Sequence, residues 1–278
     1  MFIVPHIIPH PALQSIVHHY FLLHLHFKDS VPNLKPMPAE PYQSIYFYPR
    51  DPIKKIIHST GETSQNPSSI LVGQQVERIN LEFGTDHMVI QIAFQPGGLY
   101  RLFGIPMSQF FDISINSEEI CGNIIKEINE KLTEISDYRL MIQTIEMFLL
   151  NRLKAINDTV RPIDKAMQAM LYNPGQSISF LADQACLSTR QFERNFYERI
   201  GVGPKMFSRV VRFNQVLADK RLQPKGDWLD IAYANGYFDF SHLSRDFKLF
   251  TGQTPTQLFS DEQKSSKDIN ENVVFLHT

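Results

Sequence analysis

Cysteine, long apolar runs and net charge are all scarce in this sequence, and each scarcity excludes a class of protein. The 278 residues include only two cysteines, Cys121 and Cys186, which cannot build a disulfide framework or a four-cysteine zinc site. No stretch reaches the roughly 20 uninterrupted apolar residues that a membrane-spanning helix needs. No basic segment precedes an apolar run at the start, as a secretory signal requires. We therefore expect a cytoplasmic protein without membrane association.

The composition is that of a folded protein of about two domains. Hydrophobic residues make up 43% of the chain and charged residues 20%, which are ordinary values for globular proteins and exclude general disorder. At roughly 150 residues per domain, the length suffices for two domains, each with its own core.

The net charge of -2 is distributed unevenly along the chain. The stretch 161–260 holds 13 Lys and Arg against 9 Asp and Glu, a balance of +4, whereas the remainder holds 14 basic and 20 acidic residues, a balance of -6. A basic C-terminal third attached to an acidic body is compatible with a nucleic-acid partner. On charge alone, chance would account for this asymmetry equally well.

Residues 1–116 are expected to form a β-rich domain. Frequent prolines exclude long helices in its first half, apart from a short one near 12–18. The Ser-, Thr- and Pro-rich stretch 61–69 predicts an exposed loop. Many short strands separated by turns favour a small antiparallel barrel or sandwich. β-branched and aromatic residues in partial alternation predict five strands, at 20–27, 44–48, 70–75, 78–83 and 87–94.

Two amphipathic helices are expected in the segment 117–155. Apolar residues recur at helical spacing after Ser117, and again between Leu140 and Leu153. These helices would join the front domain to the back one. Their apolar stripes suit either ordinary core packing or a dimer interface, so a homodimer is one candidate assembly.

The segment 156–262 contains an internal duplication. Apolar, arginine, glycine and proline positions match across the two copies, and the offset is 50 residues at the start and 51 after the turn. Such a match is hard to obtain by accident. The matched stretches are 181–188 with 231–238, 192–196 with 243–247, and 201–204 with 252–255.

Each copy has the physical parts of a helix-turn-helix. Gly236, which can adopt a left-handed conformation, and Cys186, interpreted as a small buried residue, mark the sharp turns. Ser188 and Asp239 are good N-caps for the second helix of each copy. That helix buries apolar side chains on one face and leaves arginine and short polar side chains on the other. A DNA-reading helix requires this arrangement.

A longer helix is expected between the two copies, from Pro204 to Leu222. A rigid helix of ~18 residues spans about 27 Å. This length is compatible with two reading helices in successive major grooves ~34 Å apart.

Residues 162–259 resemble the DNA-binding domain of the AraC/XylS family, most specifically over 230–237, 241–248 and 252–255. The resemblance implies seven helices with two helix-turn-helix units, specific binding to double-stranded DNA, and control of transcription. By position, the first DNA-reading set is Arg190, Gln191, Glu193 and Arg194, and the second is Phe240, Ser241, Ser244 and Arg245.

The sequence departs from the family pattern at two positions. Cys186 stands where glycine or alanine is usual, and Phe240 stands where polar residues are common. Phe240 could therefore make apolar contact with a thymine methyl group instead of hydrogen bonds. Outside the two reading sets, several residues could contact phosphates or could simply be solvated: Lys205, Arg209, Arg212, Lys248 and Gln253.

The front domain is similar to the small cupin-like sensor domain found ahead of this DNA-binding module, through residues 10–13 and 94–104. The resemblance implies a β-barrel sensor, and its effector pocket is not identified. The predicted fold class is α+β with two domains. A mostly-β cupin-like barrel and a helical linker precede an all-α domain with two helix-turn-helix motifs, and a polar tail over 263–278 follows.

Two histidines raise the question of a metal. His24 and His26 lie on one face of a predicted strand, as metal-binding cupin histidines do. The glycine spacing and the downstream glutamate of that motif are not recognisable, so we expect no metal and no cofactor. No Ser-His-Asp or Cys-His pattern, phosphate-binding glycine loop or catalytic carboxylate pair stands out, so we do not expect an enzyme.

The predicted function is a sequence-specific DNA-binding transcription regulator of the one-component type. Its expected partners are double-stranded DNA and an unidentified small-molecule effector, with RNA polymerase as a further candidate. The main alternative is a metal-dependent cupin-type enzyme with a DNA-binding appendage. A third is an interaction protein whose DNA-binding module has degenerated.

Overall fold

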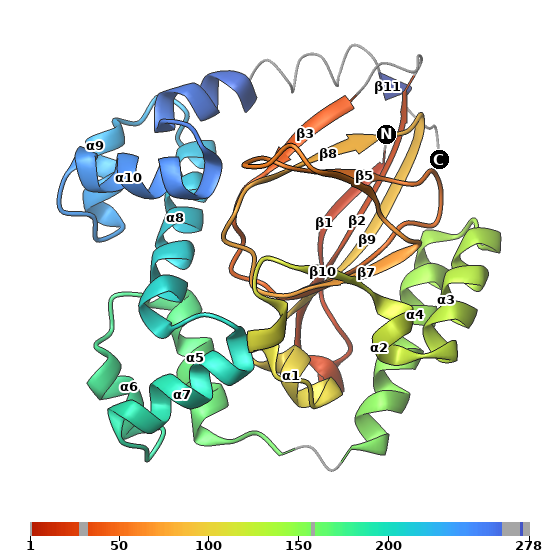
Figure 1. The fold of residues 1–278 in the computed structure, drawn as a ribbon, viewed down its shortest axis with the longest axis horizontal. Coiled ribbons are helices and arrows are strands. Elements are labelled where there is room, and N and C mark those ends of the chain that lie inside the picture. Colours follow the sequence, from red (N-terminus) through yellow and green to blue (C-terminus); the bar gives the residue numbers. More distant parts are fainter. Residues whose placement is uncertain (1, 28–32, 157–158, 263–272, 275–278) are drawn as a thin grey trace.

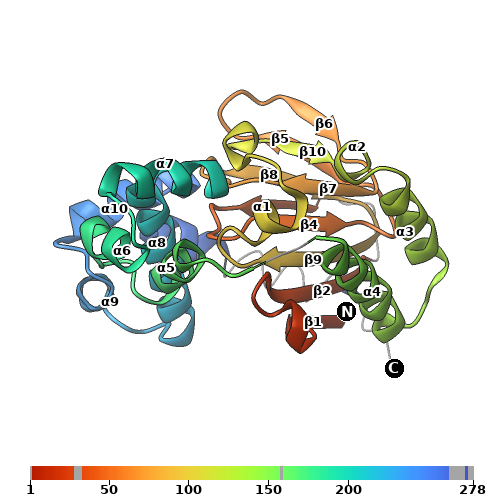
Figure 2. The same ribbon diagram turned by 90° about the horizontal axis from the view of Figure 1, so that it is seen from below.

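A computed structural model describes residues 2–27, 33–156, 159–262 and 273–274. The chain folds into a β-rich front domain and an all-helical back domain, which confirms the predicted fold class. Figures 1 and 2 place the helices of the back domain on one side of the β-sheets and the three helices within residues 117–155 on the other. Within the described residues, no helix has the length and apolar character needed to cross a membrane.

Two antiparallel sheets build the front domain. The larger sheet has the order β1-β2-β9-β4-β7-β10, with β11 also paired to β2, and the smaller sheet has the order β3-β8-β5-β6. The strands are β1 (Phe2–Ile7), β2 (Val17–Phe27), β3 (Asn33–Met37), β4 (Ser44–Phe47), β5 (Lys54–Ile57), β6 (Thr63–Gln65), β7 (Ser69–Val72), β8 (Ile79–Phe83), β9 (Asp86–Phe94), β10 (Ser114–Asn116) and β11 (Val273–Val274).

The five predicted strands are present as β2, β4, β7, β8 and β9, with ends shifted by a few residues. The sequence missed six strands: β1, β3, β5, β6, β10 and β11. Two of these, β1 and β3, contain Pro5 and Pro36, which argue against a strand, but both lie at sheet edges, where a missing N–H group is tolerated. The helix expected near 12–18 is wrong: only a 3-10 turn over Pro11–Leu13 forms, because β2 begins at Val17. The exposed loop expected over 61–69 is wrong in part, because Thr63–Gln65 form the exposed strand β6 and because Asn66 and Ser69 are buried.

Side chains of β2 alternate between two cores. Leu23 and Leu25 lie between the two sheets with residues of β7, β8 and β9, whereas Tyr20 and Leu22 pack on the opposite face against α3 and α4. This alternation is the normal consequence of a two-residue repeat in a strand. The helices of the front domain are α1 (Gly98–Phe103), α2 (Ser117–Cys121), α3 (Asn123–Glu134) and α4 (Tyr138–Ala155), with a 3-10 turn, η2 (Met107–Phe110).

The predicted helical segment 117–155 therefore forms three helices, interrupted at Gly122, where φ is +68°. The apolar faces of α3 and α4 are buried against the large sheet, through Ile128, Met141, Ile145 and Leu149 among others. These stripes belong to the core of the front domain. A homodimer stays a prediction.

The back domain contains α5 (Pro162–Tyr172), α6 (Ile178–Gln184), α7 (Thr189–Ile200), α8 (Pro204–Leu222), α9 (Trp228–Ala234) and α10 (Phe240–Thr251). A further helical segment covers 255–262. Phenylalanines fill the core, and Phe192, Phe196, Phe207, Phe213 and Phe247 are completely buried. Of the polar tail predicted over 263–278, residues 263–272 and 275–278 lie outside the described residues, and 273–274 form β11 against β2.

Candidate nucleic-acid interface

The second helix of each helix-turn-helix unit begins at its predicted N-cap. In α7, the Ser188 hydroxyl accepts the Gln191 N–H at 3.3 Å, and the Gln191 side-chain oxygen accepts the Ser188 N–H at 3.1 Å. This reciprocal pair is a capping box. In α10, Asp239 Oδ1 accepts the His242 N–H at 2.6 Å. Gln191 was predicted to read DNA, and in the structure its side-chain oxygen is engaged by the cap.

Each of these two helices has one buried and one exposed face. Phe192 and Phe196 of α7, like Leu243 and Phe247 of α10, are completely buried. The predicted reading residues lie on the other faces: Arg190, Gln191, Glu193, Arg194, Phe240, Ser241 and Arg245 are exposed, and Ser244 is partly buried. The local structure thus gives both reading sets access to a ligand.

The turns between the helices have the expected left-handed backbone, with φ of +55° at Cys186 and +74° at Gly236. The interpretation of Cys186 as a buried residue is wrong, because its side chain is exposed. Ala182 and Ala185 are the small buried residues of this unit. The sequence pattern located the turn but did not show which of its neighbours packs inward.

Arg209, a candidate phosphate contact, instead connects α8 to α10. Its Nε and Nη2 both donate to Asp246 Oδ1, at 3.1 and 2.7 Å. Asp246 is only 1% exposed, and its other oxygen accepts the hydroxyl of Tyr237 at 3.0 Å. A buried carboxylate needs such partners, so Arg209 fixes the second helix-turn-helix unit on α8.

Arg212 has a similar structural role. Its Nη1 donates to the Gly236 carbonyl at 3.1 Å, and its guanidinium lies 5.2 Å from the centre of the Tyr237 ring. Gln253 donates to Asp261 at 2.6 Å. Lys205 and Lys248 are exposed and stay predicted phosphate contacts.

Phe238 is an exposed residue that the sequence did not single out. It directly precedes the N-cap Asp239, where an apolar residue usually packs against the fourth residue of the helix, here Leu243. In the structure Phe238 is 85% exposed, so it does not make that contact. An unpacked aromatic ring beside a reading helix is a candidate DNA contact. The signal was visible in the sequence as an apolar residue in a polar turn.

The front domain contacts the C-terminal ends of both reading helices. Gln43 Nε2 donates to the carbonyl oxygens of Arg199 and Ile200, at 3.1 and 3.0 Å. Arg78 Nη1 donates to the carbonyl of Thr251 at 2.7 Å. Ile200 and Thr251 are 51 residues apart, so they occupy equivalent positions of the duplication. Helix C-termini carry partial negative charge, which favours these donors.

The glycines that follow these carbonyls also touch the front domain. A Cβ atom at Gly201 would lie 2.7 Å from the Met107 carbonyl oxygen, and one at Gly252 would lie 2.7 Å from His58 Nε2. Both glycines have positive φ, +91° and +70°. Equivalent ends of α7 and α10 therefore approach the same domain closely, while the predicted reading residues lie toward the opposite, N-terminal ends.

A buried group of charges completes the contact between the two domains. Asp164 of α5 lies 3.6 Å from Arg199 of α7 and 3.9 Å from Arg101 of α1. The Arg199 guanidinium also stacks 4.6 Å from the centre of the Tyr100 ring, whose hydroxyl donates to Glu198 at 3.1 Å. A cleft of about 200 Å³ opens beside these residues. The position of α7 is thus coupled to the front domain by charge as well as by backbone contacts.

Known families match two parts of the chain. Residues 181–261 match a family described as a helix-turn-helix domain, and residues 5–116 match a family described as a domain of unknown function. No curated protein matches the sequence.

Similar solved structures include ToxT from Vibrio cholerae, with 13% identity and a TM-score of 0.49 over 87% of this chain and 98% of that one. The unsaturated fatty acid bound wild-type ToxT from Vibrio cholerae strain SCE256 has 14% identity and a TM-score of 0.46, over 86% and 94% of the two chains. The AraC-like transcriptional activator CuxR has 11% identity and a TM-score of 0.26, over 75% and 78%.

The assignment rests on the match over 181–261 and on the geometry of the back domain. Two equivalent helix-turn-helix units present exposed reading faces and are held by one connecting helix, α8. Residues 181–261 therefore form a helix-turn-helix domain, in keeping with the resemblance of 162–259 to the DNA-binding domain of the AraC/XylS family.

Proposed function

We propose that the front domain controls how the two reading helices meet DNA, which makes this chain a one-component, effector-responsive regulator. The observation that carries this proposal is the pair of equivalent contacts at Ile200 and Thr251. Because the front domain contacts both reading helices at their C-terminal ends, a shift of this domain would displace the two helices together. An effector that prefers one arrangement of the front domain then changes the population able to bind DNA.

In the proposed complex, α7 and α10 enter two adjacent major grooves. Their connecting helix α8 has 19 residues, which corresponds to about 28 Å, against a groove repeat of ~34 Å. The predicted base contacts are the two reading sets, with arginine suited to guanine and Phe240 to a thymine methyl group. Lys205 and Lys248 would contact phosphates and position the helices.

Selection of bound sequences from random duplex DNA, with the full-length protein at a fixed salt concentration, tests the proposal. We expect an enriched motif with two half-elements about 10 base pairs apart, one for each reading helix. A motif with a single half-element contradicts the use of two grooves. If no sequence is enriched at low or at physiological salt, the protein does not bind DNA sequence-specifically. That result would favour an interaction protein whose DNA-binding module has degenerated.

We also propose the following division of the chain: 1–116 as sensor domain, 117–155 as helical linker, 156–262 as DNA-binding domain and 263–278 as tail. The proposed location is the cytoplasm, and RNA polymerase is a proposed partner.

A homodimer is the proposed assembly. Ile124, Leu140 and Met147 support it, because these apolar side chains stay about half exposed on α3 and α4. Analytical ultracentrifugation of wild type and Met147→Lys tests it, and the variant should be monomeric.

The geometry gives little support to the alternative of a metal-dependent cupin-type enzyme. Ligand sites of β-barrels lie in the barrel interior or at its mouth. His24 and His26 belong to the face of β2 opposite to Leu23 and Leu25, which line the space between the sheets. His24 instead contacts Tyr138 of α4 at 2.8 Å. We therefore propose that the chain regulates and does not catalyse.

A further inference from the structure

His24 and His26 meet a carboxylate that is distant in sequence. β2 and β9 are antiparallel, and His26 is the direct register partner of Asp86 at the start of β9. Directly opposed residues of neighbouring strands share one face of the sheet, and His24 shares it too because it lies two residues from His26. The strand pairing alone therefore brings two imidazoles and one carboxylate together.

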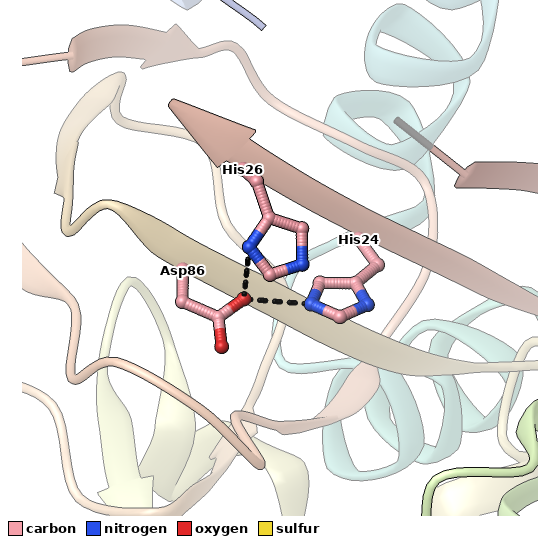
Figure 3. A group of neighbouring side chains, drawn as sticks. All are labelled: His24, His26 and Asp86. Carbon is pink, nitrogen blue, oxygen red and sulfur yellow. Dashed lines mark hydrogen bonds and ion pairs between the residues drawn. The ribbon is translucent and has the colours of Figure 1, made fainter. Parts of the chain in front are cut away.

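The side chains of this cluster converge on one point, as Figure 3 shows. Asp86 Oδ1 lies 2.7 Å from His24 Nε2 and 3.1 Å from His26 Nδ1. One ligand atom from each of the three residues falls within 4.8 Å of the others. Two ligand atoms bound to a zinc ion at about 2.1 Å each stand roughly 3.4 Å apart. Small side-chain rotations would thus suffice to place an ion between the three residues.

The cluster is buried on one side and open on the other. The His24 side chain is 9% exposed, while those of His26 and Asp86 are 32% and 34% exposed. An ion held by the three side chains would therefore be bound on its buried side by His24 and accessible to water on the side of His26 and Asp86. Three protein ligands with an open position are typical of accessible transition-metal sites.

Neighbouring groups orient the ligands. The hydroxyl of Tyr138, the first residue of α4, lies 2.8 Å from His24 Nδ1, so the other ring nitrogen, Nε2, faces Asp86. The backbone N–H of Asp86 donates to Asp51 Oδ2 at 2.8 Å. Metal-binding histidines in proteins almost always have such a partner on their second nitrogen, which fixes the ring and its tautomer.

We propose that His24, His26 and Asp86 bind a divalent transition-metal ion of the first row, such as Zn²⁺ or Fe²⁺. Two imidazoles and one carboxylate suit these ions, whereas Ca²⁺ and Mg²⁺ prefer sets made of oxygen alone. The ion would join β2, β9 and, through Tyr138, the start of α4. The proposed site departs from the expectation of a metal-free protein. It stands apart from the DNA-binding proposal, because neither depends on the other.

Titration calorimetry with Zn²⁺ on the full-length protein, freed of metal with a chelator, tests the site. We expect one equivalent of Zn²⁺ per chain. His26→Gln and Asp86→Asn should each weaken binding by at least about tenfold, and both replace partly exposed side chains, so the fold should survive. Circular dichroism checks that it does. The matched control is His10→Gln, at an exposed histidine outside the cluster, which should bind as wild type does.

A plain ion pair between two histidines and an aspartate is the competing explanation. It predicts no stoichiometric Zn²⁺ binding, and that result would overturn the proposal. Binding of equal affinity in wild type, His26→Gln and Asp86→Asn would overturn it as well. Co²⁺ gives an independent readout: its visible absorption bands should appear with wild type and shift with Tyr138→Phe, because that variant removes the hydroxyl that orients His24.

Discussion

The carbonyl oxygens of Ile200 and Thr251, at equivalent positions of the two helix-turn-helix units, each accept a hydrogen bond from the front domain. The donors differ, Gln43 for the first unit and Arg78 for the second, and they come from different parts of the front domain. The equivalence therefore results from how the domain sits against the duplication. The front domain therefore contacts both reading helices at the same end.

The double variant Gln43→Ala with Arg78→Ala should loosen the spacing that the two reading helices require. Wild type should discriminate against operators whose half-elements are moved apart by one or two base pairs, and the variant should discriminate less. Gln43→Ala leaves the carbonyls of Arg199 and Ile200 without their donor, and Arg78→Ala does the same to that of Thr251. Each substitution should therefore also cost about 1–3 kcal/mol of unfolding free energy. Affinity for a series of spaced operators measures the first effect. Unchanged spacing preference would mean that α8 alone sets the separation.

Arg194→Ala and Arg245→Ala should each weaken DNA binding at one operator position. An arginine that reads guanine contributes about 1–3 kcal/mol of discrimination at its own base pair. Affinities for operators with every base pair substituted in turn locate the effect. The matched control is Arg139→Ala, an exposed arginine of α4, which should leave the affinities unchanged. A uniform loss over all sequences would assign the arginine to a phosphate.

Lys205→Ala and Lys248→Ala should each weaken binding uniformly over all DNA sequences. A phosphate contact releases counterions whatever the sequence, so its loss weakens all sites alike and lowers the slope of log affinity against log salt by about one. Affinities at several salt concentrations give the slope. An unchanged slope would show that the lysine is simply solvated.

Phe238→Ala should weaken DNA binding without reducing stability. The ring is 85% exposed, so its removal costs little of the apolar burial that stabilises the fold. The urea midpoint should match that of wild type, while the operator affinity should fall several-fold. A lower urea midpoint would instead indicate that the ring packs in the folded protein.

Arg209→Ala should destabilise the fold by about 3 kcal/mol, because it leaves the buried carboxylate of Asp246 without its cationic partner. Arg221 provides a matched comparison, since it also pairs with a carboxylate in a two-point contact, to Glu262 at 2.6 and 3.3 Å. That pair is exposed, and Arg221→Ala should cost less than about 1 kcal/mol. Urea unfolding of both variants tests the difference. Equal costs would contradict a structural role for Arg209.

Stability should fall as the pH drops below about 6.5. Burial, followed by the neighbouring His18 and His6, lowers the pKa of His19 to about 4, and burial with His6 also lowers the pKa of His18. The unfolded chain keeps the ordinary value of about 6.5, so between these values it binds more protons and unfolding becomes easier. His19→Gln should lose less thermal stability than wild type between pH 7.5 and pH 5. The control His10→Gln should follow wild type.

The sequence was most informative where the causes are local. Ser188 and Asp239 cap their helices in the sequence and in the structure, because a cap needs only the next few residues. Two of the missed strands, β1 and β3, show the limit of local reasoning. Their prolines argue against a strand unless one knows that both lie at sheet edges, and strand order is not a local property.

The functional residues also divide into those that local sequence patterns indicate and those that depend on contacts between distant segments. The duplication placed both reading sets on exposed helix faces, because helical periodicity alone assigns faces. The pairing of Arg209 with Asp246 spans 37 residues, and nothing in the sequence distinguished that arginine from Lys205. Asp86 escaped notice for the same reason, since its closeness to His26 depends on the register of β2 with β9.

The sequence by itself thus determined the two helix-turn-helix units, their caps and turns, and the apolar faces that hold them in the core. These follow from spacing within a few helical turns. The tertiary structure alone decided that Gln43 and Arg78 hold equivalent carbonyls and that His24, His26 and Asp86 converge. Contacts of that kind depend on the relative placement of distant segments, which is set by the packing of the whole core.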